Sequence, residues 1–177
     1  MKYGTSGFTP TAPTGTQTVR LQDGEGAAYV YQMGNQITNV TTATKTLTAA
    51  DAGIVTLNRA AGVAVTLPAA TGSGLSFRVI VGTTFTGAAT IKVAPTPGTD
   101  IMSGTATLFA DGGDTTVGFA TAADSDTITL AADNSTGGVA GAQIVLTDIA
   151  SGKWHVAMVS DAAATEATPF SATVAAP

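Results

Sequence analysis

Histidine is the side chain best suited to acid–base catalysis near neutral pH, and this sequence of 177 residues contains one, His155. It lies in the alternating segment 153–158, in which Trp154 and Val156 are the apolar positions. If those two side chains face a core, His155 faces solvent or a neighbouring molecule, because successive side chains of a strand alternate. A Ser–His–acid triad would need His155, but the Gly-x-Ser-x-Gly nucleophile turn is missing. The pattern therefore predicts a surface histidine.

The carboxylates gather in turns: Asp111 and Asp114, then Asp124 and Asp126, then Asp133. A glycoside hydrolase needs two carboxylates about 5–10 Å apart on rigid elements. Aspartates in Gly- and Ala-rich turns more often accept hydrogen bonds from their own backbone. Calcium stays open as an alternative at 111–114, where hard oxygen ligands are available, although the spacing of an EF-hand loop is missing. We expect no catalytic, cofactor-binding or metal site.

Composition excludes several further kinds of chemistry. The chain has no cysteine, so it has no thiol chemistry and no Cys-based zinc site. Its glycine-rich turns, such as 72–74 and 137–138, lack the Lys-Ser/Thr of a phosphate loop. A net charge of −5 with seven basic residues argues against nucleic-acid binding and against docking on anionic membranes. Without the apolar core of a signal peptide at its start, the chain is expected to be made in a cytoplasm.

The elements that would carry any site are predicted to be β-strands. Short apolar or alternating segments recur about every 8–12 residues between turns, which is typical of a sandwich or barrel. Charged residues make up only 11%, against about 25% in typical domains, and threonine, which favours strands, supplies much of the polar surface. We expect an all-β fold, an antiparallel β-sandwich or jelly-roll-like body. Candidate strands lie at 27–32, 45–48, 54–58, 63–67, 75–81, 89–93, 105–109, 115–119, 126–130, 143–147 and 153–158.

Alternation in three of these segments separates an apolar face from a polar one. The segments are 63–67, 75–81 and 153–158. Their apolar positions are expected to form the core of the body, because the face that points inward must bury its side chains. The predicted core residues are Val65, Leu67, Phe77, Val79, Trp154 and Val156.

The ends of the chain differ in composition from the middle. Residues 1–26 carry proline and glycine without periodicity and are predicted to form an extended N-terminal arm. Such an arm either stays a disordered tail or orders against a neighbouring subunit, in which case Tyr3 and Phe8 would anchor it. Residues 27–160 form the expected β-sandwich body. Residues 161–177 form a tail that holds either a final strand or a second small arm.

Parts of the sequence resemble a family of small structural proteins of bacteriophage virions. The segment 47–53 reads LTAADAG and leads into the strand 54–58, and the segment 63–68 reads VAVTLP. A glycine turn and the apolar segment 75–81 follow, and 152–156 reads GKWHV, similar to the strand that often ends these domains. The resemblance extends over residues 43–159. It implies a virion protein of the head decoration (cement) type, and it brings no catalytic residues.

The resemblance implies a non-enzymatic subunit that binds the outside of the capsid and stabilises it. Its partners would be the major capsid protein and two further copies in a homotrimer, with no nucleic acid and no membrane, and its place would be the capsid surface of the virion. A tail-fibre or receptor-binding β domain is the alternative. A polysaccharide depolymerase would need Asp111, Asp114, Asp124 and Asp126 for turnover. A bacterial surface-layer module is disfavoured by the missing signal peptide.

Overall fold

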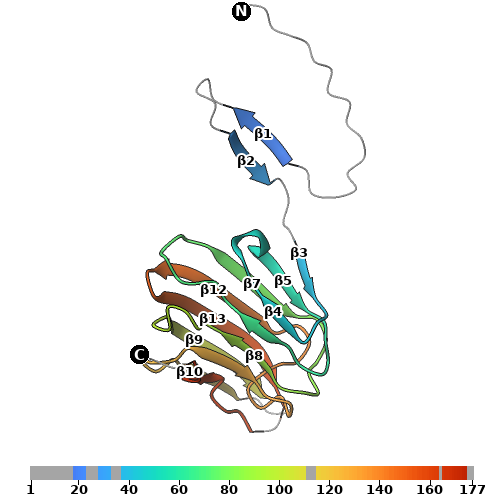
Figure 1. The fold of residues 1–177 in the computed structure, drawn as a ribbon. Helices are drawn as coiled ribbons and strands as arrows, with labels where there is room; N and C mark the ends of the chain where they lie inside the picture. Colours follow the sequence, from blue (N-terminus) through green and yellow to red (C-terminus); the bar gives the residue numbers. More distant parts are fainter. Residues whose placement is uncertain (1–17, 23–27, 33–36, 111–114, 164, 175–177) are drawn as a thin grey trace, which may run out of the picture. The chain divides into compact units, whose positions relative to one another are not determined.

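The computed structural model describes residues 18–22, 28–32, 37–110, 115–163 and 165–174 (Figure 1). The chain divides into two compact units, Met1–Gln36 and Ile37–Pro177. Composition suggests a boundary after residue 26, so the observed division lies later in the chain. Within these ranges, side chains are described from Ile37 onward.

The first unit contains two strands, β1 (Thr18–Gln22) and β2 (Ala28–Gln32). They pair in antiparallel fashion, with Thr18 opposite Gln32 and Gln22 opposite Ala28. The strand expected at 27–32 is therefore present, but it belongs to the first unit and pairs within it.

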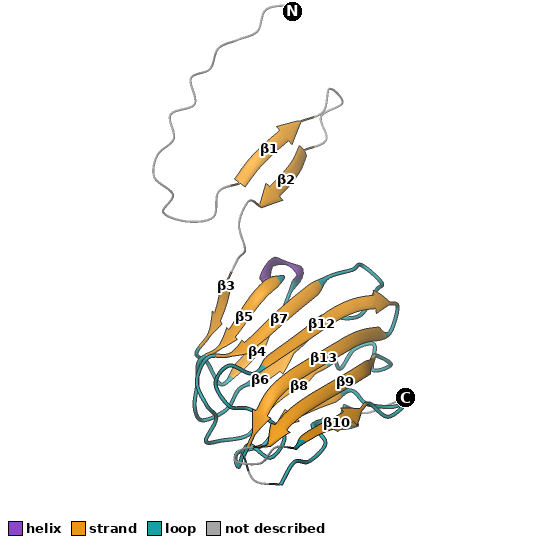
Figure 2. Cartoon of the chain, turned by 180° about the vertical axis from the view of Figure 1, so that it is seen from behind, coloured by secondary structure: helices purple, strands orange, loops and turns teal. Residues whose placement is uncertain are grey.

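The described part of the second unit is a sandwich of two sheets (Figure 2). The all-β class is confirmed, and a single turn of 3-10 helix, η1 (Ala49–Asp51), interrupts the strands. The seven-stranded sheet has the order β10-β9-β13-β12-β7-β5-β3, and the five-stranded sheet has the order β14-β11-β8-β6-β4. The strands are β3 (Ile37–Val40), β4 (Thr44–Thr46), β5 (Gly53–Leu57), β6 (Ala64–Thr66), β7 (Ser76–Val81), β8 (Ala89–Lys92), β9 (Ile101–Ala110), β10 (Thr116–Ala120), β11 (Thr127–Leu130), β12 (Gln143–Ala150), β13 (Lys153–Ala162) and β14 (Phe170–Ser171).

Both sheets are mixed rather than purely antiparallel, because the chain winds between them. Strands β3, β5 and β7 lie parallel in the larger sheet, and β4, β6 and β8, which follow each of them, lie parallel in the smaller one. Each pair of successive strands forms one coil. Equivalent residues stack from coil to coil, so that Val40 lies opposite Leu57, which lies opposite Val81. Hydrogen bonds tie the coils together beyond the strands as well, from the Leu47 N–H to the Thr66 carbonyl and from the Leu67 N–H to the Lys92 carbonyl.

The remaining strands add mostly antiparallel pairs. The hairpin of β12 and β13 inserts into the larger sheet, with β12 antiparallel to β7 and β13 parallel to β9. Strand β10 pairs with β9 at one edge of this sheet. In the smaller sheet, β11 pairs with β8 and with the short β14, so the tail contributes a final strand.

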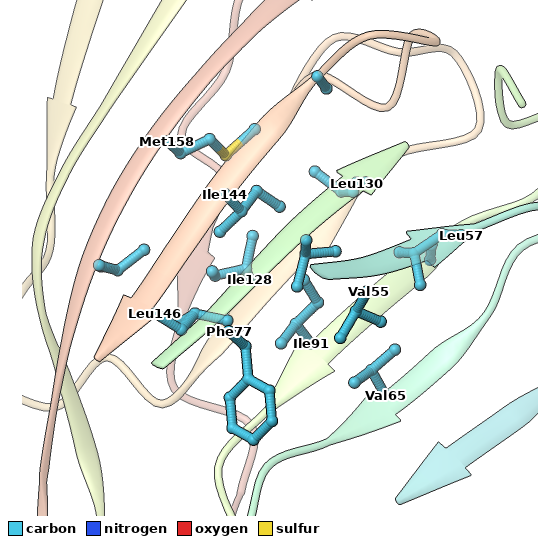
Figure 3. Packing of buried hydrophobic residues seen from close by; sticks show 14 of the residues in the cluster. Val55, Leu57, Val65, Phe77, Ile91, Ile128, Leu130, Ile144, Leu146 and Met158 are labelled. Carbon is cyan, nitrogen blue, oxygen red and sulfur yellow. The ribbon is translucent and has the colours of Figure 1, made fainter. Parts of the chain in front are cut away.

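The core lies between the two sheets (Figure 3). Trp154 is completely buried, and its ring lies 5.9 Å from that of Phe77 between centroids. Each of the six expected core residues is at most 1% exposed. The alternation of β13, in which every second residue is buried from Trp154 to Ala162, explains why a period of two identified the inward positions. The six are Val65, Leu67, Phe77, Val79, Trp154 and Val156.

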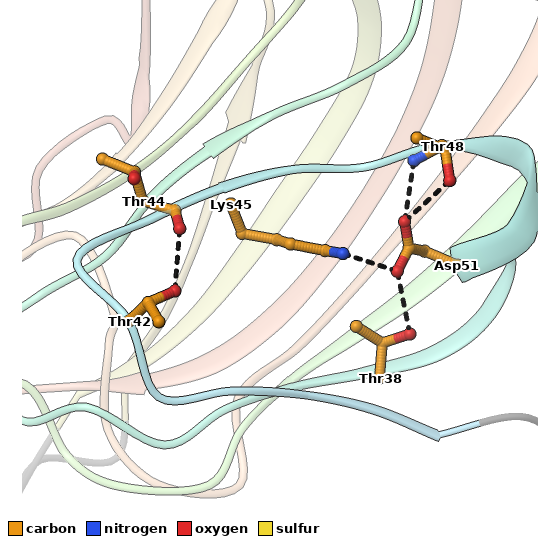
Figure 4. A network of polar contacts seen from close by, with 6 residues as sticks. All are labelled: Thr38, Thr42, Thr44, Lys45, Thr48 and Asp51. Atoms are coloured by element: carbon orange, nitrogen blue, oxygen red, sulfur yellow. Dashed lines mark hydrogen bonds and ion pairs between the residues drawn. The ribbon is translucent and has the colours of Figure 1, made fainter.

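The first coil closes one end of the core with polar groups (Figure 4). Thr38 continues the inward row of Val55 and Val79, and Lys45 continues the inward row of Val65 and Ile91. The inward row of the larger sheet thus ends in the hydroxyl of Thr38, and the inward row of the smaller sheet ends in the ammonium group of Lys45. Terminal coils of stacked β structures need such a polar end to stay soluble.

The carboxylate of Asp51 joins these groups into what we call the polar end cap: Thr38, Lys45, Thr48 and Asp51. Oδ1 lies 2.7 Å from Lys45 Nζ and accepts a hydrogen bond from Thr38 at 3.2 Å. Oδ2 accepts from the N–H and the hydroxyl of Thr48, each at 2.9 Å. Partial burial raises the pKa of Asp51, but the hydrogen bonds from Lys45 and Thr48 lower it, and the net shift is downward.

Candidate assembly surface

The solvent-facing side of the seven-stranded sheet, here called the outer face, exposes large apolar side chains. Val145 and Ile149 of β12 are 36% and 50% exposed, and Val159 of β13 is 50% exposed. Ile37 of β3 and Phe109 of β9 are 61% and 44% exposed. Scattered single hydrophobics are ordinary on soluble proteins. Val145, Val159 and Phe109, however, are diagonal neighbours in the register of β12, β13 and β9, and a contiguous apolar stripe of this kind indicates a contact surface.

Strand register places Val145 near the middle of this face. It lies opposite Ala157 of β13 on one side and Arg78 of β7 on the other. The Arg78 guanidinium donates from Nε to the Gln143 side-chain oxygen at 3.2 Å, and this contact holds the cation along the sheet. The centre of the outer face therefore combines small and branched apolar groups with one oriented arginine, a residue enriched at protein interfaces.

His155 lies on the same face. It is exposed, opposite Thr147 of β12 and Ser103 of β9. Its neighbours in the register are hydroxyl side chains, and the structure brings no carboxylate into the register beside it. The position agrees with the solvent-facing orientation that alternation predicted.

A hollow of about 350 Å³ lies at the starts of β9 and β13, and its lining includes Ser103, the residue opposite His155. Ile101 and Met102 supply apolar walls, Ser103 and Thr121 supply hydroxyls, and Lys153 supplies a cation. Such a hollow suits one side chain of a docked protein that carries an acceptor group. No local sequence pattern indicates it, because its walls come from three separate segments.

The five-stranded sheet presents a different surface. Its outward positions are largely threonines, and the large hydrophobics that are exposed in the described residues lie elsewhere. Across the strands, Thr46 lies opposite Thr66 and Thr90 lies opposite Thr129. The two faces of the sandwich thus differ, and the apolar one is the candidate contact surface.

Two buried carboxylates fix one loop at an end of the sandwich. Asp148, 1% exposed, accepts hydrogen bonds from the backbone N–H groups of Thr71, Gly72 and Ser73 at 3.0, 2.7 and 2.9 Å. The hydroxyls of Thr71 and Ser73 donate to it at 3.2 and 2.7 Å. Asp100, 3% exposed, accepts from the Ala70 N–H at 2.7 Å. Four successive backbone N–H groups therefore donate to two carboxylates.

The electrostatics of Asp148 follow from these contacts. Burial raises the pKa of its carboxyl, but the hydroxyl of Ser73 and the backbone N–H groups of residues 71–73 stabilise the charged form and hold the pKa well below its usual range. A carboxylate whose oxygens are saturated with donors is a poor general base. We interpret this cluster as a structural clamp between the β6–β7 loop and strand β12.

The other aspartates identified in the sequence differ from one another in position and contacts. Asp111 and Asp114 lie outside the described residues. Asp126 is buried and accepts from the N–H groups of Thr173 and Val174 at 2.8 and 2.9 Å, so it holds the C-terminal segment. Asp124 is exposed.

Asp133 bonds within its own turn. It accepts from the N–H of Ser135 at 3.0 Å and from its hydroxyl at 2.8 Å, and these bonds lower the pKa of Asp133. Within the described ranges, three or more His, Asp or Glu side chains do not gather at any point that would hold a metal ion. Asp133 has the role expected for turn aspartates, because it caps its own turn. Asp126 instead binds backbone N–H groups 47 and 48 residues away, a long-range contact that differs from the local capping expected.

The proposed anchors of the N-terminal arm, Tyr3 and Phe8, lie outside the described residues. Sequence reasoning did not identify Asp148, Asp100 or the apolar outward positions of β12 and β13. Apolar side chains at both odd and even positions, as in Ile144-Val145-Leu146 and at Val156 and Val159, are the signal that would have indicated apolar residues on the outer face.

Comparisons with protein-family models, with curated proteins and with solved structures found no match. In the part of the chain that the structure describes, no helix is long and apolar enough to cross a membrane.

Proposed function

We propose that this chain is a structural subunit of a bacteriophage virion that binds the outside of the capsid as a decoration subunit and stabilises it. The observation that carries the proposal is the apolar outer face of the seven-stranded sheet. This face exposes Ile37, Phe109, Val145, Ile149 and Val159 on a rigid two-sheet body. A protein that acts by docking needs such a surface, whereas an enzyme needs a convergent set of reactive groups.

The residues that resemble phage structural proteins contribute to this body. Segments 47–58 and 63–68 build the second coil, and segment 152–156 begins β13, which carries Lys153 and His155 onto the outer face. The coil stacking and the buried Trp154 make the face rigid. Rigid faces bind with less loss of conformational entropy than loops do.

The outer face also fits a protein partner better than a charged polymer. Along β7, β9, β12 and β13, the charged side chains at described outward positions are Arg78, Lys153 and Asp161. A partner surface that is mainly apolar and uncharged complements it. The proposed partner is the major capsid protein, with the subunit made in the host cytoplasm and bound as a homotrimer at a three-fold position of the capsid.

Co-sedimentation with undecorated capsids tests the proposal. The wild-type protein is expected to pellet with the capsids, and Val145→Asp, which places a charge in the middle of the outer face, is expected to stay in the supernatant. Ala64→Asp serves as the matched control, because it adds the same charge at an exposed strand position of β6, in the five-stranded sheet. It should pellet like the wild type.

The other outcomes decide against the proposal or part of it. If Val145→Asp pellets as well as Ala64→Asp does, the outer face is not the contact surface. If the wild type ignores capsids and binds host cells instead, the tail-fibre or receptor-binding alternative replaces the decoration role. Binding to neither removes both functions.

A further inference from the structure

Among the described strands, β10 forms a free edge of the seven-stranded sheet, since the register pairs it with β9 and with no other of these strands. The Ala110 N–H donates to the Thr115 carbonyl, and the Thr121 N–H donates to the Gly104 carbonyl, each at 3.1 Å. In an antiparallel pair, alternate residues bond to the same neighbour. The odd-numbered residues of this segment therefore face β9. The N–H and C=O groups of Thr116, Gly118 and Ala120 point to the free edge.

This edge lacks the protection that natural sheets give their edges. Charged residues, prolines and bulges normally prevent a second strand from adding to an edge. Residues 115–123 contain neither charge nor proline, and the register between β9 and β10 runs without interruption. The opposite end of the sandwich shows the contrast, because Lys45 and Asp51 of the polar end cap lie there.

The side of β10 that faces the sandwich interior is apolar and incompletely covered. Val117 lies opposite Leu108 and Phe119 lies opposite Ala106, and both Leu108 and Ala106 are buried core residues. Val117 and Phe119 themselves are only half-buried, although Phe119 packs against the core. A further strand beside β10 would bring apolar groups against both.

The sequence of β10 is complementary to itself about Gly118. We propose that β10 of one copy pairs in antiparallel fashion with β10 of a second copy, across a two-fold axis at Gly118. In this register Gly118 faces Gly118 of the other copy, and Thr116 faces Ala120. These are the residues whose backbone groups point outward, so each pair exchanges two hydrogen bonds.

The same register places the apolar residues together. Val117 of one copy faces Phe119 of the other, twice, in the narrow pairs where side chains approach most closely. Aromatic and β-branched residues are favourable cross-strand partners. One register therefore forms the backbone hydrogen bonds at Gly118 and also brings the valine before it into contact with the phenylalanine after it. The two larger sheets then join into one continuous sheet.

This contact does not depend on the proposed function. It is two-fold, whereas the expected capsid-bound state is a trimer, so on a capsid it would link subunits of neighbouring trimers. In solution it at least doubles the mass of whichever assembly the rest of the molecule forms.

Light scattering over a concentration series tests the inference with Gly118→Lys. A side chain at Gly118 would begin in open space, since nothing lies within 4 Å of its Cβ position. The two new ammonium groups face each other across the axis and repel. At high concentration the mass of Gly118→Lys is expected to be at most half that of the wild type. Thr46→Lys, which adds the same charge to the exposed edge strand β4 at the other end, should match the wild type.

A cross-link supplies an independent readout, because the chain contains no cysteine. Oxidised Gly118→Cys is expected to run at twice the chain mass in a denaturing gel, and Thr46→Cys at the chain mass. Thermal melting of each variant shows that it is folded. Equal masses of folded Gly118→Lys and wild type at every concentration, or equal cross-linking of the two cysteine variants, would overturn the proposal.

Discussion

Asp148 and Ser73, 75 residues apart in the sequence, are joined by two hydrogen bonds to one carboxylate oxygen. The Ser73 hydroxyl lies 2.7 Å and the Ser73 N–H lies 2.9 Å from Asp148 Oδ2. This contact connects the loop before β7 to the end of β12, next to the pairing of β7 with β12. The contact between Asp148 and Ser73 closes one end of the sandwich, and the polar end cap closes the core at the first coil.

Replacing Asp148 with asparagine should destabilise the fold. An amide oxygen accepts hydrogen bonds less strongly than a carboxylate does, and the amide nitrogen would face N–H donors. Hydrogen bonds to charged groups contribute about 1.5–3 kcal/mol each, and part of this is lost, so we expect a loss of about 2–3 kcal/mol in the free energy of unfolding. Urea denaturation measures it. Asp124→Asn, at an exposed position, is the control. Equal stability of the two variants would contradict the role of Asp148.

Lowering the pH should lower the melting temperature of the protein, because two carboxyl groups have lowered pKa values in the folded chain. The pKa values of Asp148 and Asp51 are lower in the folded chain than the ordinary value of 3.8. A carboxyl with a lowered folded pKa contributes stability above its unfolded pKa and loses that contribution as the pH falls toward its folded pKa. The melting temperature should therefore hold down to about pH 5 and fall below about pH 4. The fall should be shallower in Asp148→Asn, and parallel curves for the two proteins would contradict this assignment.

Trp154→Ala should be among the most destabilising single substitutions. The indole is fully buried against Phe77, so removing it leaves a cavity between the sheets. Phe or Trp to Ala changes in cores cost about 3–5 kcal/mol. Chemical denaturation measures the change, with Val159→Ala on the exposed outer face as the control. A mutant that unfolds at the wild-type denaturant concentration would show that this core site is not required.

Two glycines in neighbouring strands should respond differently to alanine, one with a loss of stability and the other with no change. A Cβ on Gly104 of β9 would lie 1.8 Å from the carbonyl oxygen of Val156 in β13, so Gly104→Ala must push the parallel strands apart. A loss of about 2–3 kcal/mol is expected, within the range of strongly disruptive point mutations. Gly118→Ala meets open space and should melt like the wild type. Similar melting temperatures for both variants would argue against the close approach of β9 and β13.

Alternation made the inward positions of β7 and β13 predictable, since Phe77, Val79, Trp154 and Val156 follow a period of two. The same period cannot distinguish a parallel from an antiparallel partner, because pairing depends on which distant strand lies beside a segment. For this reason the winding of β3 to β8 was not predicted.

The candidate surface was less predictable than the core. Outward-facing valines on β12 and β13 read as ordinary strand residues until the burial of the alternate positions is known. The clamp at Asp148 depends on three backbone N–H groups from a loop 75–77 residues away, and local sequence carries no sign of such a contact.

The insertion of β12 and β13 between β7 and β9 sets the order in which the sandwich becomes complete during synthesis. A ribosome releases β3 to β9 first, and these strands include the neighbours of the gap on both sides, but the hairpin that bridges them is made later. Until residues 143–162 emerge, β7 and β9 hold two separate halves of the larger sheet, each with an unpaired edge beside the other. During synthesis, the seven strands of the larger sheet therefore cannot form one continuous sheet before β13 leaves the exit tunnel. A nascent chain that stalls before that point exposes the unpaired edges of β7 and β9 to chaperones.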